Sequence, residues 1–535
     1  MKLISGGEIL VDCLRKQGVR HVFSIIGGQM GTIYDTIGHR DDIDLFIPRC
    51  ETVTPLMAAG YTASTGVPAA SLTTVGAGVV YEVAGLAYAW LNYLPVISLA
   101  PQVQSWKTKP HQESLQACNQ DEIYYPLTKW NTIVYHWKRI PKMMTRGFRE
   151  AYTGVPGPVH LDFPVDILFQ RSFWSPSDLN EVPVVKREAA ITGIASQIEE
   201  ASAVLKKAEK AVVVVGQGIG RAGRYRAICA LLNQAGLPVM TTRFSSGVMR
   251  GSDEAYAGAV SLFAETNKGM ALLKDADAIV VVGADPETIA VIEKCGWKSK
   301  KIIQIETDPS ALMTWASYPV HADPLSALGE IIANVGSVAK AKEWLKSFRN
   351  IVHDLTEELA PSDEGINAAI TALGQICGAD DIIVSDGAGI SQAAAYLLRD
   401  AQYRDLFCMD ENDMPGVGLP FAIGAAIGNP RAKVNLICDK ESLFAHVREL
   451  SPAIQAGVAL RIIVADEENA AINCADTAAV LEGLGCSVKQ HSMIDSGTEI
   501  PEFRATTISA LVLRPLPEKV PVRLKQQEAE RVLVR

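Results

Sequence analysis

Short apolar runs alternate with segments of helical periodicity along the chain, most clearly in its first third. Apolar positions recur with helical spacing over residues 7–17, 52–65 and 81–90. The apolar runs that predict strands are residues 21–26, 45–49, 69–74, 95–100 and 158–164. Such short continuous runs are typical of parallel strands that helices cover on both faces. Residues 1–170 are therefore predicted to form an open α/β domain.

Two further blocks repeat this pattern. The second has apolar runs at residues 211–220, 237–242, 278–284 and 301–309. The third has them after residue 380 and at residues 433–439, 459–466 and 510–515, with a helix expected at 475–484. Residues 171–188 are rich in Ser, Pro and charge and are predicted to be a linker. We expect an α/β protein with three open, mostly parallel-sheet domains, at residues 1–170, 189–340 and 355–535.

Composition and charge exclude several classes of protein. The chain has 50 Lys and Arg against 60 Asp and Glu, a net charge of -10, and no basic block that could bind nucleic acid. No membrane span is expected, because the chain has no run of 18 apolar residues. The charged N-terminal segment is expected to be an amphipathic helix and not a signal peptide. The ten cysteines form no CxxC pair, which argues against a zinc site and favours reduced thiols in the cytoplasm.

Two kinds of strand end in the second block could face a nucleotide. The glycine turn at residues 216–220 follows a strand, but it lacks the spacing of the dinucleotide motif and the acidic residue after the next strand. A tight strand-to-helix turn is the simpler interpretation. Gly283-Ala-Asp285 and Thr307-Asp308-Pro309 also lie at strand ends, where they are compatible with a nucleotide without requiring one.

Glu51 lies between the strand at residues 45–49 and the helix at 52–65. This is the carboxyl end of a predicted parallel strand, the edge at which open α/β sheets bind ligands. Taken alone, a carboxylate at a helix N-terminus is explained by its favourable interaction with the helix dipole. Whether Glu51 also has a functional role depends on the residues around it.

Several segments, in order along nearly the whole chain, resemble the thiamine diphosphate enzymes of the acetolactate synthase type. They are EILVDCLRKQGVRHVFSIIGG, RCETVTPLMAAGYTASTG, TTVGAGVVYEVAGLAYAWLNYLPVISLAPQV, LQACNQDEIYYPLTKW, GPVHLDFPVDI and GVGLPFAIGAAIG. The resemblance implies a pyrimidine-binding, a central and a diphosphate-binding domain. It also implies a cofactor between the first domain of one chain and the third of another, and hence an oligomer with a copy of this chain or a related one.

The resemblance assigns roles to individual residues. Glu51 matches the catalytic glutamate, whose carboxyl group binds a nitrogen of the cofactor's pyrimidine ring and so promotes proton transfer. The residues that match cofactor-lining positions are Gly27, Gly28, Thr74, Gly76, Gly78, Gln116, Met414 and Pro415. In three places the residue type departs from the family, because Cys50 replaces a frequent His and Ile26 and Ala77 replace prolines.

The third block departs further, at the motif that holds the metal and the diphosphate. The family pattern is GDG followed by NN, and here the matching residues are Asp439-Lys440-Glu441 and Asp466-Glu467. A second register, which places Asp439 on the metal-binding Asp, still lacks both glycines that allow close approach to a diphosphate. Lys440 cannot hold Mg²⁺, which needs oxygen ligands, so Mg²⁺ is not expected in this chain.

The segment after this motif is also short. The family has a loop and lid of some tens of residues here, whereas residues 466–473 run almost directly into the helix expected at 475–484. A missing lid would leave the site open to water. The central block lacks the Arg- and Asp-rich run expected for a flavin after Gly283-Ala, and the sequence leaves FAD undecided.

These features allow three hypotheses. In the first, the chain is a subunit of a heteromeric lyase or transferase that makes or breaks a C–C bond beside a 2-oxo group. It binds thiamine diphosphate only at a site shared with a partner chain, and its substrate is a 2-oxo acid. In the second, the chain is a non-catalytic structural or regulatory paralogue. In the third, the fold performs chemistry that does not use thiamine diphosphate.

Overall fold

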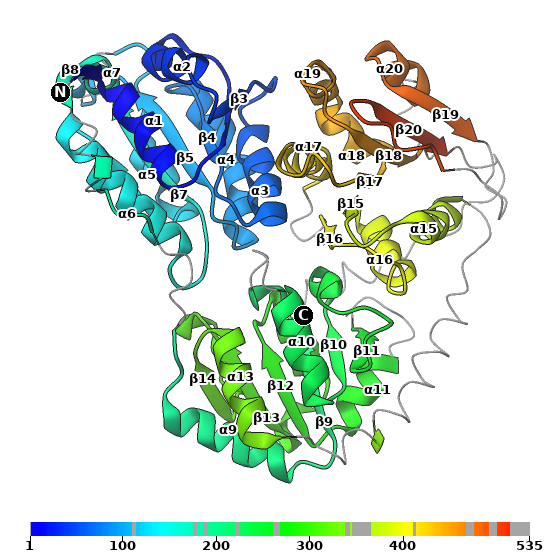
Figure 1. Cartoon of the computed structure of the whole chain (residues 1–535). Helices are drawn as coiled ribbons and strands as arrows, with labels where there is room; N and C mark the ends of the chain where they lie inside the picture. Colours follow the sequence, from blue (N-terminus) through cyan, green and yellow to red (C-terminus); the bar gives the residue numbers. More distant parts are fainter. Residues whose placement is uncertain are drawn as a thin grey trace. The chain divides into compact units, whose positions relative to one another are not determined.

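The computed structural model describes residues 2–109, 114–174, 179–180, 182–185, 191–219, 225–260, 268–336, 343–344, 365–409, 414–466, 476–491 and 500–513. These residues contain three six-stranded sheets, and every strand pair within the three sheets is parallel (Figure 1). The predicted α/β fold class is confirmed.

The first sheet has the strand order β3-β2-β4-β5-β7-β6. Its strands are β2 (His21–Ser24), β3 (Asp44–Phe46), β4 (Ala70–Leu72), β5 (Ile97–Gln102), β6 (Trp130–Ile133) and β7 (Val159–Pro164). Its helices are α1 (Gly6–Lys16), α2 (Gly31–Gly38), α3 (Val53–Thr65), α4 (Ala77–Leu91), α5 (Gln120–Tyr124), α6 (Ile140–Tyr152) and α7 (Val165–Phe169).

The second sheet has the order β11-β10-β9-β12-β13-β14. Its strands are β9 (Ala211–Val215), β10 (Val239–Thr241), β11 (Tyr256–Ala259), β12 (Ala278–Val282), β13 (Lys301–Glu306) and β14 (Tyr318–His321). Its helices are α9 (Ala195–Lys207), α10 (Tyr225–Ala235), α11 (Lys268–Asp275), α12 (Pro286–Lys294) and α13 (Pro324–Val335). Numbered within the domain, this order is 3-2-1-4-5-6, that of dinucleotide-binding folds.

The third sheet has the order β16-β15-β17-β18-β20-β19. Its strands are β15 (Ile382–Asp386), β16 (Asp405–Cys408), β17 (Val434–Asp439), β18 (Leu460–Ala465), β19 (Ser487–His491) and β20 (Ile508–Leu513). The helices of this part of the chain are α15 (Gly365–Ile376), α16 (Ala388–Leu397), α17 (Gly418–Gly428), α18 (Lys440–His446), α19 (Leu450–Gln455) and α20 (Thr477–Gly483). When the strands are numbered within each sheet, the first and third sheets both have the order 2-1-3-4-6-5, so they share one topology.

The chain divides into two compact units. Residues 1–355 and 420–430 form one unit, and residues 356–419 and 431–535 form the other. Most of α17 therefore belongs with the first two sheets, although the rest of the third block forms its own unit. No helix in the described part of the chain has the length and apolar character needed to cross a membrane.

One expectation about the linker is wrong. The first four residues of the predicted linker at 171–188 form the strand β8 (Arg171–Trp174), which pairs antiparallel with β1 (Lys2–Ser5). The side chains of Ser172 and Trp174 are buried, whereas those of Arg171 and Phe173 are exposed. This alternation is the signal of a strand, but four residues are too few to distinguish it from a loop in the sequence alone.

The start of α1 shows how the sequence fixes an element boundary. Ser5 ends β1, and its hydroxyl accepts a hydrogen bond from the Glu8 backbone N–H at 3.2 Å. The Glu8 carboxylate accepts one from the Ser5 N–H at 2.6 Å, which completes a capping box. The strand therefore ends at Ser5, which caps the helix that begins at Gly6.

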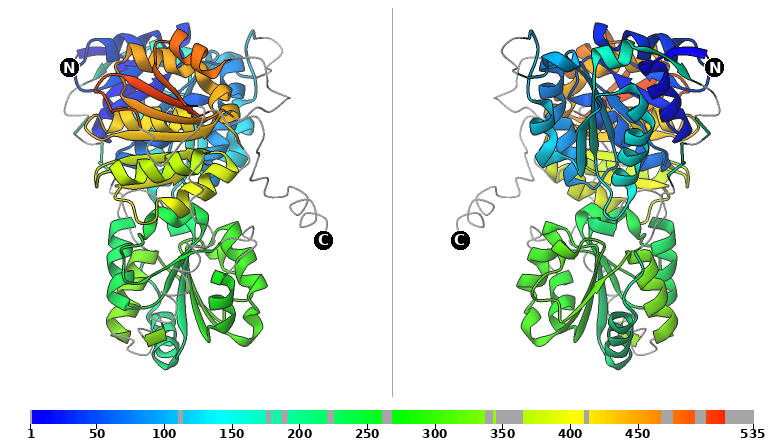
Figure 2. Two further views of the ribbon diagram at one scale, coloured as in Figure 1. Left: turned by 90° about the vertical axis from the view of Figure 1, so that its right-hand side faces the viewer. Right: turned by 90° about the vertical axis from the view of Figure 1, so that its left-hand side faces the viewer.

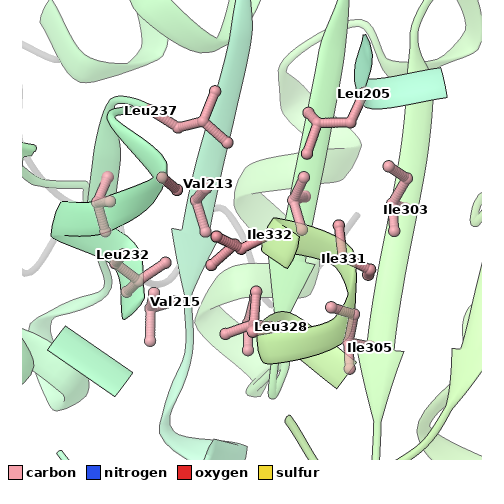
Figure 3. Packing of buried hydrophobic residues seen from close by; sticks show 14 of the residues in the cluster. Leu205, Val213, Val215, Leu232, Leu237, Ile303, Ile305, Leu328, Ile331 and Ile332 are labelled. Carbon is pink, nitrogen blue, oxygen red and sulfur yellow. The ribbon is translucent and has the colours of Figure 1, made fainter. Parts of the chain in front are cut away.

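The central sheet has a hydrophobic core on each face. In β9, Val213 and Val215 face a cluster that includes residues of α9, α10 and α13, as Figure 3 shows for Leu205, Leu232 and Leu328. Val212 and Val214 face the opposite cluster, which contains residues of α11 and α12. Figure 2 shows this sheet between its two layers of helices. Both faces of β9 are buried, as its continuous apolar run predicts.

Helices α3 and α17 touch through glycines. A Cβ atom on Gly60 would lie 2.0 Å from the carbonyl oxygen of Phe421, and one on Gly424 would lie 1.9 Å from that of Met57. The two helix backbones are therefore in direct contact, which no larger residue permits. These contacts hold residues 420–430 within the first compact unit.

We predict that Gly60→Ala destabilises the protein by about 1–3 kcal/mol, because the added methyl group must push the two helices apart. Gly329→Ala is the control. Gly329 lies inside α13, and a Cβ atom there would meet no atom within 4 Å, so alanine should stabilise the protein by about 0.5–1 kcal/mol. Urea unfolding of both variants measures the difference, and equal stability of the two would contradict the prediction.

Candidate functional site

The turn that carries Glu51 is fixed by contacts with its neighbours. Glu51 is half-buried, and its carbonyl oxygen accepts hydrogen bonds from the Thr54 N–H at 3.1 Å and the Thr54 hydroxyl at 2.8 Å. The Thr52 hydroxyl donates to the Tyr81 carbonyl at 2.6 Å. A Cβ on Gly85 would lie 2.0 Å from the Thr52 carbonyl oxygen, so α4 packs directly against this turn. Glu51 precedes α3 by two residues instead of beginning it.

The predicted cofactor-lining residues of the first domain come together at the same edge of the sheet. A Cβ on Gly27 would lie 2.6 Å from Cγ2 of Thr74, and one on Gly78 would lie 2.2 Å from the Thr74 hydroxyl oxygen. Gly76 has a φ of 72°, and its Cβ would lie 2.4 Å from the carbonyl oxygen of Gln116. Glycine is required at Gly76 by its conformation and by this contact.

Gln116 is itself held in the left-handed region, with a φ of 68°. Its side-chain oxygen accepts a hydrogen bond from Nε2 of Gln29 at 3.2 Å, which joins the loop after β5 to the turn after β2. A side chain at Gly28 would meet no atom within 4 Å, so this position faces open space. The structure thus assembles the turns after β2 and β4 and the Gln116 loop into one surface.

An ion pair lies at the carboxyl edge of the third sheet. Asp439 ends β17, and its carboxylate accepts a hydrogen bond from the Ser442 N–H at 2.7 Å, which caps α18. The next residue, Lys440, places Nζ 3.0 Å from Oδ1 of Asp466, just after β18. The two side chains are only 13% and 8% exposed. The ammonium group therefore lies between the ends of β17 and β18 with its charge largely neutralised.

A second carboxylate lies beside Asp439. Asp386 ends β15, is buried, and accepts a hydrogen bond from the Gly418 N–H at 2.6 Å. Burial raises the pKa of Asp386 to about 7, and the charge of Asp439 contributes to the shift. A Cβ on Gly387 would lie 2.5 Å from an oxygen of Asp439, so the ends of β15 and β17 are close together.

The described residues of this edge do not fit a Mg²⁺ ion with a diphosphate. In the part of the chain that the structure describes, no group of three or more His, Cys, Asp or Glu could hold a metal ion. Asp466 is paired with a cation of the chain itself, and Glu441 is exposed. Glu467 lies outside the described residues. Met414 is half-buried and Pro415 is exposed in the turn that leads to α17.

The glycine turn of the central domain is a packing element. Gly216 N–H donates to the Val282 carbonyl at 3.0 Å, and Gly218 N–H donates to the Gly283 carbonyl at 2.9 Å. A Cβ on Gly216 would lie 2.3 Å from the Gly283 oxygen. The ends of β9 and β12 therefore pack backbone to backbone at the point where the strand order reverses.

The Asp285 carboxylate accepts the hydrogen bonds of donors in and around this turn. It accepts hydrogen bonds from the Gln217 N–H at 2.8 Å, the Thr242 hydroxyl at 2.8 Å and the Thr288 N–H at 2.7 Å. Gln217 in turn donates its side-chain amide to Asn92, at the end of α4, at 2.6 Å. The amide that could meet a phosphate thus binds an acid of the chain, and the glycine turn joins the central and first domains.

The sequence analysis did not identify Gln120 and Glu82, which support the candidate site from the interior of the first domain. Nε2 of Gln120 donates to Asp162, and its oxygen accepts the Gly76 N–H at 3.2 Å. Glu82 is fully buried in α4. One signal was available, because Glu82 is the only charged residue in the apolar stretch of residues 77–91.

Comparison with known proteins agrees with this geometry. Residues 4–123 match the N-terminal TPP binding domain of thiamine pyrophosphate enzymes, and residues 198–331 match the central domain of these enzymes. The first two domains are of the thiamine pyrophosphate enzyme type. Thiamine pyrophosphate is the same compound as thiamine diphosphate, so the matches place the Glu51 turn and the Gly76 turn in a cofactor-binding kind of domain.

Three acetolactate synthases illustrate the wider similarity. The chain is 28% identical over 486 residues to the acetolactate synthase isozyme 1 large subunit of Escherichia coli. The aligned region covers 87% of this chain and 82% of that protein. The mitochondrial catalytic subunit of Saccharomyces cerevisiae is 26% identical over 87% of this chain and 71% of its own length. The Bacillus subtilis acetolactate synthase is 28% identical over 84% of this chain and 79% of its own.

The central domain of the thiamine pyrophosphate enzyme type carries another buried acid at the end of its sheet. Glu306 ends β13, and its carboxylate accepts a hydrogen bond from the Ala284 N–H at 2.6 Å. Burial raises the pKa of Glu306 to about 7, and the charges of Asp285 and Asp308 add to this effect. The protonation of this acid therefore changes near neutral pH.

We predict that Glu306 makes the protein less stable as the pH rises. Between its ordinary pKa near 4.5 and the folded-state pKa of about 7, the folded state binds more protons than the unfolded state. Glu306→Gln keeps an acceptor for Ala284 and cannot ionise. Its stability relative to the parent chain should therefore increase by about 2–3 kcal/mol from pH 5 to pH 8, as measured by urea unfolding. A pH-independent difference would show that Glu306 does not titrate in this range.

Proposed function

We propose that this chain is a subunit of a heteromeric thiamine diphosphate enzyme that makes or breaks a C–C bond beside a 2-oxo group. The supporting observation is a contrast between the carboxyl edges of the first and third sheets. The first domain packs the Gly27, Gly76 and Gln116 turns against one another and holds the Glu51 turn against α4. In the third domain, Lys440 and Asp466 pair with each other at the positions that match the family's metal site. The similarity to acetolactate synthases supports a lyase or transferase acting on a 2-oxo acid.

The residues of the first domain fit the pyrimidine half of the cofactor. When bound, thiamine diphosphate supplies a nucleophilic carbon that can add to the 2-oxo group of a substrate. Glu51 would hold its carboxyl proton toward a ring nitrogen, as an acid–base group must. The open space at Gly28 would admit a flat ring, and the hydrogen-bonded Gln29–Gln116 pair would bound it on one side.

The third domain has a different part in this proposal. An ammonium group is a single charge with three donors and cannot bridge oxygen ligands as a divalent ion does. Lys440 therefore does not replace the metal, and a partner chain with an intact motif would supply the metal and diphosphate half. Related proteins are named as large or catalytic subunits, which supports a role as one subunit of an assembly.

An apolar face of α4 supports association with another chain. Val80, Tyr81 and Leu91 are 55%, 62% and 49% exposed, and the exposed Ala77 and Ala84 continue the same stripe at helical spacing. Such a stripe is normally buried against a partner. It begins at the Gly76 turn, so a chain that covers it would also lie beside the candidate site.

The proposal is tested by cofactor binding with and without a partner. By calorimetry, the purified chain alone should not bind thiamine diphosphate with micromolar affinity in the presence of Mg²⁺, because its own metal half is absent. A related chain that carries GDG and NN, mixed with this one, should bind the cofactor and decarboxylate or condense a 2-oxo acid. Micromolar, Mg²⁺-dependent binding by this chain alone would overturn the heteromeric proposal.

We predict that Glu51→Gln abolishes most activity of the complex without unfolding the protein. Glutamine keeps the shape of the side chain and removes the acid, so the rate should fall by about 10²-fold or more. The free energy of unfolding should change by less than about 1 kcal/mol, because no core volume changes. Glu199→Gln, at an exposed position of α9, is the matched control and should leave both unchanged. Full activity of Glu51→Gln would favour a non-catalytic role.

We predict that the α4 stripe is an interface. Light scattering of the parent chain should give a mass at least twice 57.6 kDa at micromolar concentration. Tyr81→Glu places a charge in the stripe and should raise the dissociation constant at least about tenfold. Tyr135→Glu, at another exposed tyrosine of the same domain, should not. The idea is wrong if both variants associate as the parent chain does.

A further inference from the structure

Glu82 is a charged residue at the centre of the first domain. Its side chain is fully buried on α4, between the sheet and the helices that cover it. Its carboxylate accepts hydrogen bonds from three hydroxyl groups, those of Ser71 on β4, Ser98 on β5 at 2.9 Å and Tyr124 on α5 at 2.5 Å. Three donors on one carboxylate compensate much of the desolvation that burial imposes.

One branch of this network leads to the catalytic candidate. The Ser71 hydroxyl, which donates to Glu82, lies 2.8 Å from the Thr54 hydroxyl. The Thr54 hydroxyl also donates to the carbonyl oxygen of Glu51 at 2.8 Å. Both hydroxyl-bearing residues are fully buried, so water does not compete for these bonds. Glu82 is thus linked through two hydroxyl groups to the backbone of Glu51.

A second branch leads to the glycine turn. The Ser98 hydroxyl lies 2.8 Å from Nδ1 of His160, and Nε2 of His160 lies 3.0 Å from the Asp162 carboxylate. Asp162 accepts the side-chain amide of Gln120 at 2.5 Å, and the Gln120 oxygen accepts the Gly76 N–H at 3.2 Å. The imidazole also stacks on Tyr124, with ring centroids 3.5 Å apart.

A count of protons orders the donors and acceptors of the His160 branch. The Ser98 hydroxyl donates to Glu82, so Nδ1–H of His160 must donate to Ser98. The remaining bond, from His160 to Asp162, is then made either by an imidazolium and a carboxylate or by a neutral ring and a carboxylic acid. Both arrangements leave the His160–Asp162 pair without net charge. Burial raises the pKa of Glu82 and of Asp162, and His160 lowers both.

The same count shows how Glu82 affects the hydrogen bonding of the Glu51 carbonyl. The Thr54 hydroxyl has one proton for two acceptors, Ser71 and the Glu51 carbonyl. Because Ser71 donates its proton to Glu82, its oxygen is left to accept from Thr54, and this fixes the orientation of both hydroxyl groups. The side chain at position 82 therefore sets the hydrogen bonding of a turn that it does not touch.

We propose that Glu82 is a positioning residue of the candidate site, which holds the Glu51 turn through Ser71 and Thr54 and the Gly76 turn through Ser98, His160, Asp162 and Gln120. The assignment of both turns to the site rests on the proposed function. The coupling between them does not, because it follows from the hydrogen bonds alone. An apolar residue at position 82 would pack as well, but it would leave three buried hydroxyl groups to find other partners.

Amide hydrogen exchange of the full-length protein tests the proposal without any cofactor. Glu82→Leu should accelerate exchange at least about tenfold in the peptides that contain Thr54 and Gly76, because both branches lose their common acceptor. Ser71→Ala should accelerate exchange only in the Thr54 peptide, and Asp162→Asn only in the Gly76 peptide. Glu82→Gln should restore most of the protection at both turns, because its amide can accept from and donate to the same hydroxyl groups.

Thr62→Val is the matched control. Thr62 is fully buried in α3 and accepts the Ala69 N–H at 3.2 Å, but it does not belong to the network. It should not change exchange at either turn. The proposal is overturned if Glu82→Leu has no larger effect at the two turns than Thr62→Val, or if the first domain loosens uniformly. If Glu82→Leu does not fold, the opposite patterns of Ser71→Ala and Asp162→Asn still decide. Failure of cofactor binding would leave this result unaffected.

Discussion

The parallel arrangement of the strands determines where chemistry can occur in this protein. In each of the three sheets all carboxyl ends lie along one edge, so the turns that follow the strands converge there. The backbone amides of such turns need hydrogen-bond acceptors, and the charged side chains among them need counter-charges. The three domains differ more clearly in the groups that supply these partners than in their strand orders.

Among the residues that the structure describes, the charged groups of two of the edges are paired within the chain. In the central domain, the Asp285 carboxylate accepts a backbone amide and a threonine hydroxyl at the point where the strand order reverses. In the third domain, Lys440 neutralises Asp466 at 3.0 Å. The first edge differs, because its glycine turns pack together while Gly28 faces open space and Glu51 remains half-buried. This contrast among the described residues is what supports placing the proposed site in the first domain.

Much of the fold could be predicted from the sequence, because runs such as residues 211–215 are apolar on both faces and the covering helices are periodic. The four-residue β8 could not, since its alternation is too short to separate from a loop. Glu51, Gly76 and Gln116 were identified through resemblance to a family, and the structure brings the Gly76 and Gln116 turns into contact. The Glu82 network was not foreseen. Its members come from separate strands and helices, and only the folded sheet makes them neighbours.

The buried network gives the first edge a rigidity that its glycines alone would not provide. Glycine turns permit close packing but lose more conformational entropy on folding than other residues, so they need contacts that fix them. Gly76 obtains one from Gln120, which is held by Asp162, and Glu51 obtains one from Thr54, which is held by Ser71. Both routes end at Glu82, whose buried carboxyl group accepts a hydrogen bond from each of three hydroxyl groups. Burying a carboxyl group costs desolvation that an apolar residue at this position would avoid. The burial of Glu82 is explained most simply by the bonds that link it to the Glu51 and Gly76 turns.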